Sequence, residues 1–173
     1  ISLKKKIDKQ NKKTKYEVDL TYITSRGNWY YNSWKGDESK SGGISTNIGV
    51  HFFDMLGFVF GKITKNTIHV HSHDRAAGYL EFKKARVRWF LSINEKLLPK
   101  KAIKNKLKTY RSISIEGEEF EFSKGFTELH RESYKQILNG KGFSLKENKQ
   151  AIDIVYNIRN SKISPLKNDY HPL

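Results

Sequence analysis

The segment from residue 41 to residue 60 constrains the fold more than any other part of the chain. It begins with the small residues Ser41-Gly42-Gly43 and continues over 45–60 as a predicted helix that is apolar on nearly every side and stops at Gly61. A helix of this kind is stable only when it is buried. Three polar side chains interrupt it at a spacing that places them on roughly one face: Asn47, His51 and Asp54.

The other periodic segments predict a sheet for this helix to cover. Residues 16–24 alternate and are rich in β-formers, which is typical of a strand. Further strands are predicted at 67–73, 77–82, 86–92, 108–115 and 118–122, and further helices at 126–138 and 145–158. Tight hairpin connections are predicted at Phe82-Lys83-Lys84-Ala85-Arg86 and at Glu116-Gly117. The sum is an α+β fold, with an open, mostly antiparallel sheet and helices on one face.

Length and composition predict a single domain in a cytoplasmic protein. The 173 residues support a single core, with 15–173 as its body and 1–14 as the end of a helix and a linker. A start at Ile1 rather than Met predicts a fragment of a longer protein. The chain has no Cys, which fits a reducing cytoplasm, and no run approaches the about 18–20 apolar residues of a membrane span.

The net charge of +15 raises the question of nucleic-acid binding. The Lys residues are spread along the whole chain, and the densest run, 99–108, has no interleaved aromatic residues. This pattern favours a solvated surface, so no nucleic-acid partner is expected, while a phosphorylated small molecule is compatible with the charge. A non-catalytic binding or scaffold module with a basic surface is the alternative to an enzyme.

His51 is the first candidate for chemistry. A His exchanges protons near neutral pH, as the oxidation of an alcohol requires, and Asn47 one turn earlier could orient the ring or a substrate hydroxyl, with Thr46 beside it. The competing interpretation is a core histidine that bonds to Asp54 or to the backbone. The spacing leaves both open.

Two other constellations carry possible chemistry. In the long loop 25–43, Arg26 suits a carboxylate or pyrophosphate, and the Trp and Tyr residues around it offer stacking surfaces for rings. An aromatic structural loop explains the same composition. His69, His71 and His73 would project from one strand face and could bind a metal, but an ordinary sheet face is favoured and no metal is expected.

No Gly-x-Gly-x-x-Gly follows a predicted strand anywhere in the chain. If the protein is a dehydrogenase, its dinucleotide-binding domain therefore lies outside this sequence.

Several motifs together resemble the C-terminal domain of the Gfo/Idh/MocA oxidoreductases. The family pattern is Gly-Gly, then an acidic residue, then Gly-x-His-x-x-Asp, and it is matched at Gly42-Gly43 and at Gly49-Val50-His51 with Asp54. Other segments resemble the subgroup that oxidises UDP-N-acetyl-glucosaminuronate (UDP-GlcNAcA) for lipopolysaccharide O-antigen sugars: Thr24-Ser25-Arg26-Gly27-Asn28-Trp29-Tyr30, Trp34-Lys35-Gly36, Asp74-Arg75-Ala76-Ala77-Gly78, Leu129-His130 and Ser133-Tyr134.

The resemblance implies a two-domain enzyme in which a Rossmann half binds NAD and this half binds the UDP-sugar. It implies oxidation of the sugar C3 hydroxyl, with His51 as acid/base, and an inactive isolated fragment. Asn47 stands where many members have Asp, which shifts proton transfer onto His51 and a Lys of the other domain. Arg26, Asn28 and Lys35 would meet the carboxylate and pyrophosphate. A homo-oligomer, dimer or tetramer, formed through the sheet is also implied.

Overall fold

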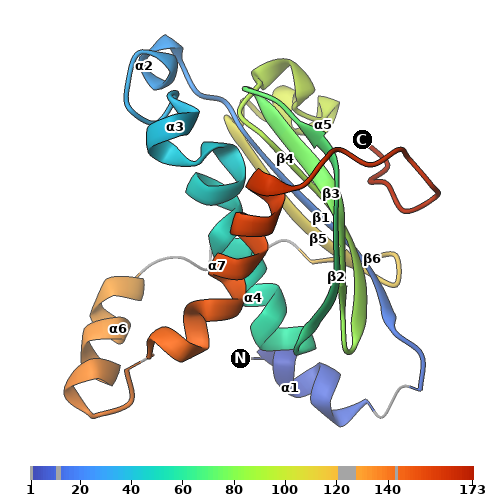
Figure 1. Ribbon diagram of the computed structural model, residues 1–173, viewed down its shortest axis with the longest axis vertical. Coiled ribbons are helices and arrows are strands. Elements are labelled where there is room, and N and C mark those ends of the chain that lie inside the picture. The colour runs from blue at the N-terminus through green and yellow to red at the C-terminus, as the bar shows by residue number, and fades with distance from the viewer. Residues whose placement is uncertain (1, 11–12, 121–127, 143) are drawn as a thin grey trace.

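The fold is built on one six-stranded sheet with the strand order β2-β3-β4-β1-β5-β6 (Figure 1). The computed structural model describes residues 2–10, 13–120, 128–142 and 144–173. The strands are β1 (Tyr16–Thr24), β2 (Ile63–His71), β3 (Arg75–Phe82), β4 (Ala85–Ser92), β5 (Thr109–Ile115) and β6 (Glu118–Phe120). Only the β1–β4 pair is parallel among these strands, and the other four pairs are antiparallel. The predicted open, mostly antiparallel sheet is confirmed.

Both predicted hairpins are present. Lys83 and Lys84 connect β3 to β4, and Glu116-Gly117 connects β5 to β6 with positive φ at both residues, as a two-residue turn of type I′ requires. β2 begins four residues before the prediction, with polar residues such as Lys65 in the added part. β2 is an edge strand, where polar side chains can face solvent, and this weakens the alternation that sequence analysis relies on.

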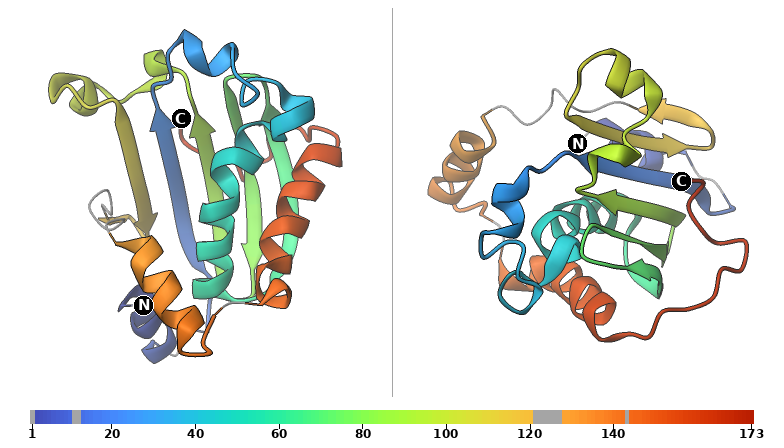
Figure 2. Two further views of the ribbon diagram at one scale, coloured as in Figure 1. Left: turned by 90° about the vertical axis from the view of Figure 1, so that its left-hand side faces the viewer. Right: turned by 90° about the horizontal axis from the view of Figure 1, so that it is seen from above.

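The helices that build the core lie on one face of the sheet (Figure 2). They are α1 (Ser2–Lys9), a π-helical turn η1 (Ser45–Gly49), α4 (Val50–Phe60) and α7 (Leu145–Asn160). Phe53 of α4 and Trp89 of β4 are fully buried, and their rings meet edge to face with centroids 5.3 Å apart. α1 adds Ile7 to the same core, so the packing shows no break near residue 14. The boundary between a linker at 1–14 and a domain body at 15–173 stays a prediction.

The remaining helices are short or stand apart. They are α2 (Asn28–Tyr31), α3 (Glu38–Ser41), the 3-10 turn η2 (Glu95–Leu97), α5 (Lys100–Lys104) and α6 (Leu129–Leu138). α6 stands away from the sheet in Figure 1. The predicted strand and helix ends at 121–122 and 126–127 lie outside the described residues. Across the described helices, none is both long and apolar enough to cross a membrane.

The other face of the sheet, here called the outer face, carries charged pairs and the C-terminal segment 161–173. The two guanidinium nitrogens of Arg88 donate to the Asp19 carboxylate over 2.6 and 2.7 Å. The C-terminal segment begins beside β2, where the Ser164 N–H donates to the Ile68 carbonyl, and reaches β1, where the His171 ring lies 3.0 Å from the Thr21 hydroxyl. The segment therefore crosses the outer face rather than trailing free.

Candidate active site

A pocket of about 490 Å³ opens between the sheet and the start of α4, close to the end of β1. Its volume lies within the range of small-molecule sites. The lining comes from β1 and its following loop, from η1 and α4, and from β5: Tyr22, Arg26, Asn47, Ile48, His51, Phe52, Met55 and Arg111. Two residues predicted to be catalytic, Asn47 and His51, and one predicted to bind substrate, Arg26, therefore share one pocket.

Glycines determine how the chain enters this site. α3 ends at Gly42 and Gly43, which adopt positive φ, and a Cβ added at Gly42 would lie 2.6 Å from Oγ1 of Thr46. The next turn, η1, is π-helical and not α-helical as predicted, and such turns are frequent at functional sites. A Cβ added at Gly49 would lie 2.7 Å from the Phe53 ring and 2.9 Å from Leu91, so only glycine lets η1 approach β4 this closely.

His51 is exposed on the outer side of α4 and lines the pocket. The interpretation as a core histidine is therefore wrong, because the helix buries one face only and keeps Phe53, Leu56 and Phe60 inside. Burial raises the pKa of the neighbouring Asp54 carboxyl, and the charge of His51 acts against that rise. Asp54 lines a different hollow, and the residues that line the pocket with His51 include no Asp or Glu.

The buried donor atoms that lie without a hydrogen-bond partner in the described part of the chain include Nε of Arg26 and Nδ2 of Asn47, both in the lining of this pocket. The Asn47 amide lies near the buried Tyr30 hydroxyl but does not form a hydrogen bond of ordinary geometry with it. Burial raises the pKa of Tyr30, while Arg26 and Asn47 act in the opposite direction. Buried donors in folded proteins are normally paired, so these atoms point to a ligand with acceptor oxygens.

The structure places the other three predicted binding residues outside the pocket lining. Thr46 donates its hydroxyl proton to the Gly42 carbonyl over 2.8 Å, which closes the turn before η1. Asn28 is exposed at the start of α2. Lys35 holds its Nζ over the rings of Trp29 and Trp34, at 6.0 and 5.8 Å from the centroids. Their assignment to substrate stays a prediction.

Sequence reasoning missed Arg111 and Tyr22. Both can be found from strand alternation, because Arg111 continues the row of Ile115 and Ile113, whose side chains enter the core beneath the helices. Tyr22 is the register partner of Arg111 on β1, and the guanidinium lies 5.2 Å from its ring centroid. A charged residue on an otherwise buried strand face was the available signal.

The predicted row of three histidines does not share one strand face. A register shift between Ile68 and Val70 breaks the alternation at His69, which lies 3.1 Å from the Ser164 carbonyl and 3.1 Å from Asp169. His71 instead lies 3.1 Å from Glu38 of α3, and His73 lies beyond the strand. Within the described part of the chain, no group of three or more His, Cys, Asp or Glu could hold a metal.

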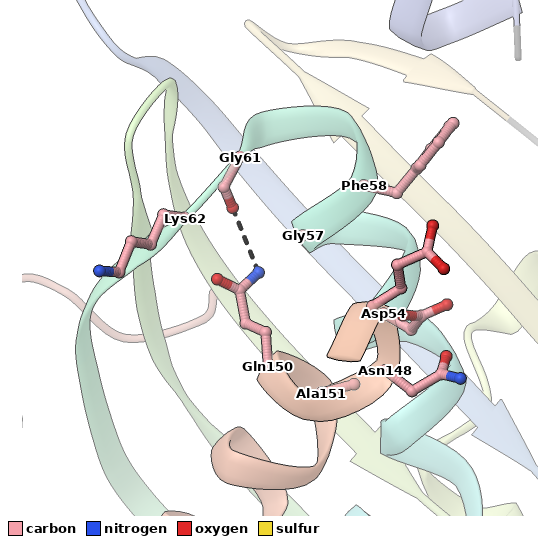
Figure 3. Close-up of a pocket in the computed structure, with 9 residues that line it drawn as sticks. Asp54, Gly57, Phe58, Gly61, Lys62, Asn148, Gln150 and Ala151 are labelled. Atoms are coloured by element: carbon pink, nitrogen blue, oxygen red, sulfur yellow. Dashed lines mark hydrogen bonds between the residues drawn. The ribbon is translucent and has the colours of Figure 1, made fainter. Parts of the chain in front are cut away.

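A second hollow, of about 630 Å³, lies between α4 and α7 (Figure 3). Gln150 of α7 links that helix to the end of α4 and the start of β2: its amide nitrogen donates to the Gly61 carbonyl over 3.3 Å, and its oxygen accepts from the Ile63 N–H over 2.9 Å. Asp54, Lys62 and Glu147 also line this hollow, which contains none of the residues predicted to be catalytic or to bind substrate.

Comparison with known proteins agrees with this arrangement. Residues 4–100 match the profile of the oxidoreductase family C-terminal alpha/beta domain of Gfo/Idh/MocA proteins. The chain belongs to this family. The structure is also similar, with a TM-score of 0.93 and 46% identity, to the WlbA (WbpB) dehydrogenase from Thermus thermophilus in complex with NAD and α-ketoglutarate, and the match covers 99% of this chain and 55% of that one.

Two further structures extend the comparison within the Gfo/Idh/MocA family. The same Thermus thermophilus dehydrogenase in complex with NAD and UDP-GlcNAcA is 44% identical, with a TM-score of 0.92 and the same coverage. The WlbA dehydrogenase from Bordetella pertussis, in complex with NADH and UDP-GlcNAcA, is 17% identical with a TM-score of 0.68, over 96% of this chain and 60% of that one, and so shares the fold. The chain spans about 55% of the Thermus thermophilus relative.

Proposed function

We propose that this domain is the substrate-binding half of an NAD-dependent dehydrogenase. The substrate is a UDP-N-acetylated hexuronic acid, oxidised at its C3 hydroxyl during the synthesis of lipopolysaccharide O-antigen sugars in the cytoplasm. The observation that carries the proposal is the pocket that joins His51 to Asn47 and Arg26, in a chain 44% identical to a dehydrogenase in complex with NAD and UDP-GlcNAcA.

In this proposal His51 accepts the proton of the C3 hydroxyl. Its exposed ring lines the pocket, with no Asp or Glu in the lining to compete for that proton. Asn47 lies one turn before His51, and its Nδ2 donates to a sugar oxygen and orients the ring. Phe52 and Met55 supply the apolar wall against which the sugar ring packs.

NAD, when bound, would supply the acceptor for the hydride of C3, whose oxidation gives a ketone. The described residues include no glycine-rich turn between a strand and a helix that would bind a dinucleotide, and their donors fit the oxygens of a sugar instead. The proposal therefore assigns NAD to residues outside these 173 and gives this domain the tasks of holding the sugar and moving the proton.

The test uses the full-length protein with UDP-GlcNAcA and NAD, followed by the absorbance of NADH. We expect turnover by the wild type and a loss of kcat of about 10²–10⁴-fold in His51→Asn, which is the usual contribution of a general base. His130→Asn is the matched control, because His130 is exposed on α6, outside the pocket lining. Full activity in His51→Asn would overturn the role of this residue, and no turnover by the wild type would overturn the substrate.

The outer face of the sheet supports a second part of the proposal, a homo-oligomer. Phe90, Ala77 and Ile23 form a small buried apolar cluster there, and the partly exposed Val70 and Leu97 pack against it and line a hollow of about 500 Å³. Partly exposed apolar side chains around a hollow are suited to a contact between proteins. We expect a dimer or tetramer by sedimentation velocity and smaller species after Val70→Lys. A monomeric wild type would contradict this.

A further inference from the structure

We infer that Tyr30 is a positioning residue for the proposed reaction, and that its hydroxyl accepts a hydrogen bond from the Asn47 amide when the sugar is bound. The inference rests on the proposed function and adds to it a residue that stands behind the pocket lining. Its starting point is the Tyr30 hydroxyl: the residue is only 4% exposed, and its Oη forms no hydrogen bond of ordinary geometry within the described residues. Buried hydroxyl groups are normally paired, so this one points to a partner that completes its hydrogen bonding.

Three such polar groups meet behind the pocket. Nε of Arg26 and Nδ2 of Asn47 are also buried without a hydrogen bond of ordinary geometry among the described residues. Burial raises the pKa of Tyr30, and Arg26 and Asn47 lie close enough to its hydroxyl to act against that rise. The three side chains come from separate segments, namely the loop after β1, α2 and η1. Tyr30 therefore joins two residues of the lining to the core behind them.

Tyr30 itself is firmly held. Its ring belongs to the main hydrophobic core, and the ring of Trp29 meets it edge to face with centroids 5.8 Å apart. Its N–H donates to the Gly27 carbonyl over 3.0 Å, and its carbonyl accepts from the Ser33 hydroxyl over 2.8 Å. A phenol fixed at both ring and backbone is a suitable support for the neighbouring amide of Asn47.

The chemistry of the two groups explains how Tyr30 acts. The amide nitrogen of Asn47 has two N–H bonds, and a neutral phenol oxygen can accept a hydrogen bond. When one N–H donates to the Tyr30 hydroxyl, the amide is fixed and the other N–H is directed to a sugar oxygen beside His51. Hydrogen bonds of active sites are often poorly aligned until substrate is bound, which fits the geometry of this pair. Tyr30 thus acts on the sugar through Asn47 and does not touch it.

The test is a double-mutant cycle on the full-length protein, read as kcat/KM with UDP-GlcNAcA and NAD. The variants are Tyr30→Phe, Asn47→Ala and the two combined. Tyr30→Phe removes the hydroxyl and keeps the buried ring, and thermal unfolding of each variant checks its fold. Tyr156→Phe is the matched control, because Tyr156 is exposed on α7 and outside the pocket lining.

We expect Tyr30→Phe to lower kcat/KM by about 3–10-fold, the loss typical of one hydrogen bond, and Tyr156→Phe to leave it unchanged. In the Asn47→Ala background, Tyr30→Phe should cause no further loss, because the residue through which Tyr30 acts is gone. A merely structural role of Tyr30 would not depend on Asn47, and the two losses would then multiply.

The same fold loss from Tyr30→Phe in both backgrounds would overturn the inference, and so would an unchanged kcat/KM in Tyr30→Phe. Either result, obtained with an active wild type, leaves the proposed dehydrogenase standing. The proposed function fails by a different result, namely no reduction of NAD by the wild type with UDP-GlcNAcA, and that result would overturn both. The two failures are therefore distinguishable.

Discussion

The buried ring of His171 should make the stability of the protein depend on pH. Its Nδ1 accepts a hydrogen bond from the Leu173 N–H over 3.1 Å, so it carries no proton, and its Nε2 lies 3.0 Å from the Thr21 hydroxyl and can donate to it. The ring also packs against Phe90, with centroids 5.7 Å apart. Burial lowers the pKa of His171 to about 4, with Asp19 acting against that shift and Arg88 adding to it.

The sign and size of the effect follow from the shift. A histidine with a lowered pKa in the folded state stabilises the protein fully above its ordinary pKa of 6.5, and this stabilisation is lost as the pH falls toward about 4. At about 1.36 kcal/mol per pKa unit, the loss amounts to about 3 kcal/mol. Protonation would also place an N–H at Nδ1 against the Leu173 N–H, so the C-terminal segment should detach first.

The assay compares urea unfolding of the wild type and of His171→Phe, which keeps an aromatic ring against Phe90 and cannot titrate. The stability advantage of the wild type should be constant above pH 6.5 and should shrink by about 3 kcal/mol on the way to about pH 4. An NMR titration of the ring gives its pKa directly. A pH-independent difference between the two proteins, or a ring that titrates near 6.5, would refute the reasoning about the buried neutral ring.

Three further predictions concern the fold around the site. Burial alone would raise the pKa of Asp74, but hydrogen bonds from Asn94, Arg75 and Ser72 lower it to about 2. Asp74→Asn should therefore cost about 2 kcal/mol of unfolding free energy above pH 3.8 and progressively less toward about pH 2. A cost that does not depend on pH would contradict this prediction. Gly49→Ala should destabilise by about 1–3 kcal/mol in urea unfolding, because its Cβ would meet Phe53, and a neutral result would show that η1 can shift. Phe53→Ala should cost about 3–5 kcal/mol, whereas the exposed Phe58→Ala should cost far less, and equal costs in urea would contradict the assigned burial.

Much of the fold could be predicted from the chain alone. Strand signals in the sequence located the six strands of the sheet, and the connections at 82–86 and 116–117 predicted two hairpins, because local backbone geometry depends on neighbouring residues. The parallel β1–β4 pair carried no local signal, since it joins residues about 70 positions apart. There was also no signal in the sequence for the register shift at His69, and this shift is why the three histidines do not share one strand face.

Some residues of the candidate site could be predicted from the sequence, and other features of the site could not. Asn47 and His51 could be found because they interrupt an apolar helix, and Arg26 could be found because it begins a polar and aromatic loop. The exposure of His51 could not be predicted, since periodicity does not show which side of a short helix a sheet leaves open. Arg111 joins Arg26 in the pocket only because β5 pairs with β1.

The sequence by itself thus determined the α+β class, the helix at the centre of the site and the residue types available for proton transfer, because these depend on spacing along the chain. The tertiary structure alone decided that His51 faces a pocket, that Thr46 closes a turn, and that two arginines from separate segments stand in one cavity. Those outcomes depend on long-range strand pairing and on how closely Gly49 lets η1 approach the sheet, which spacing along the chain does not encode.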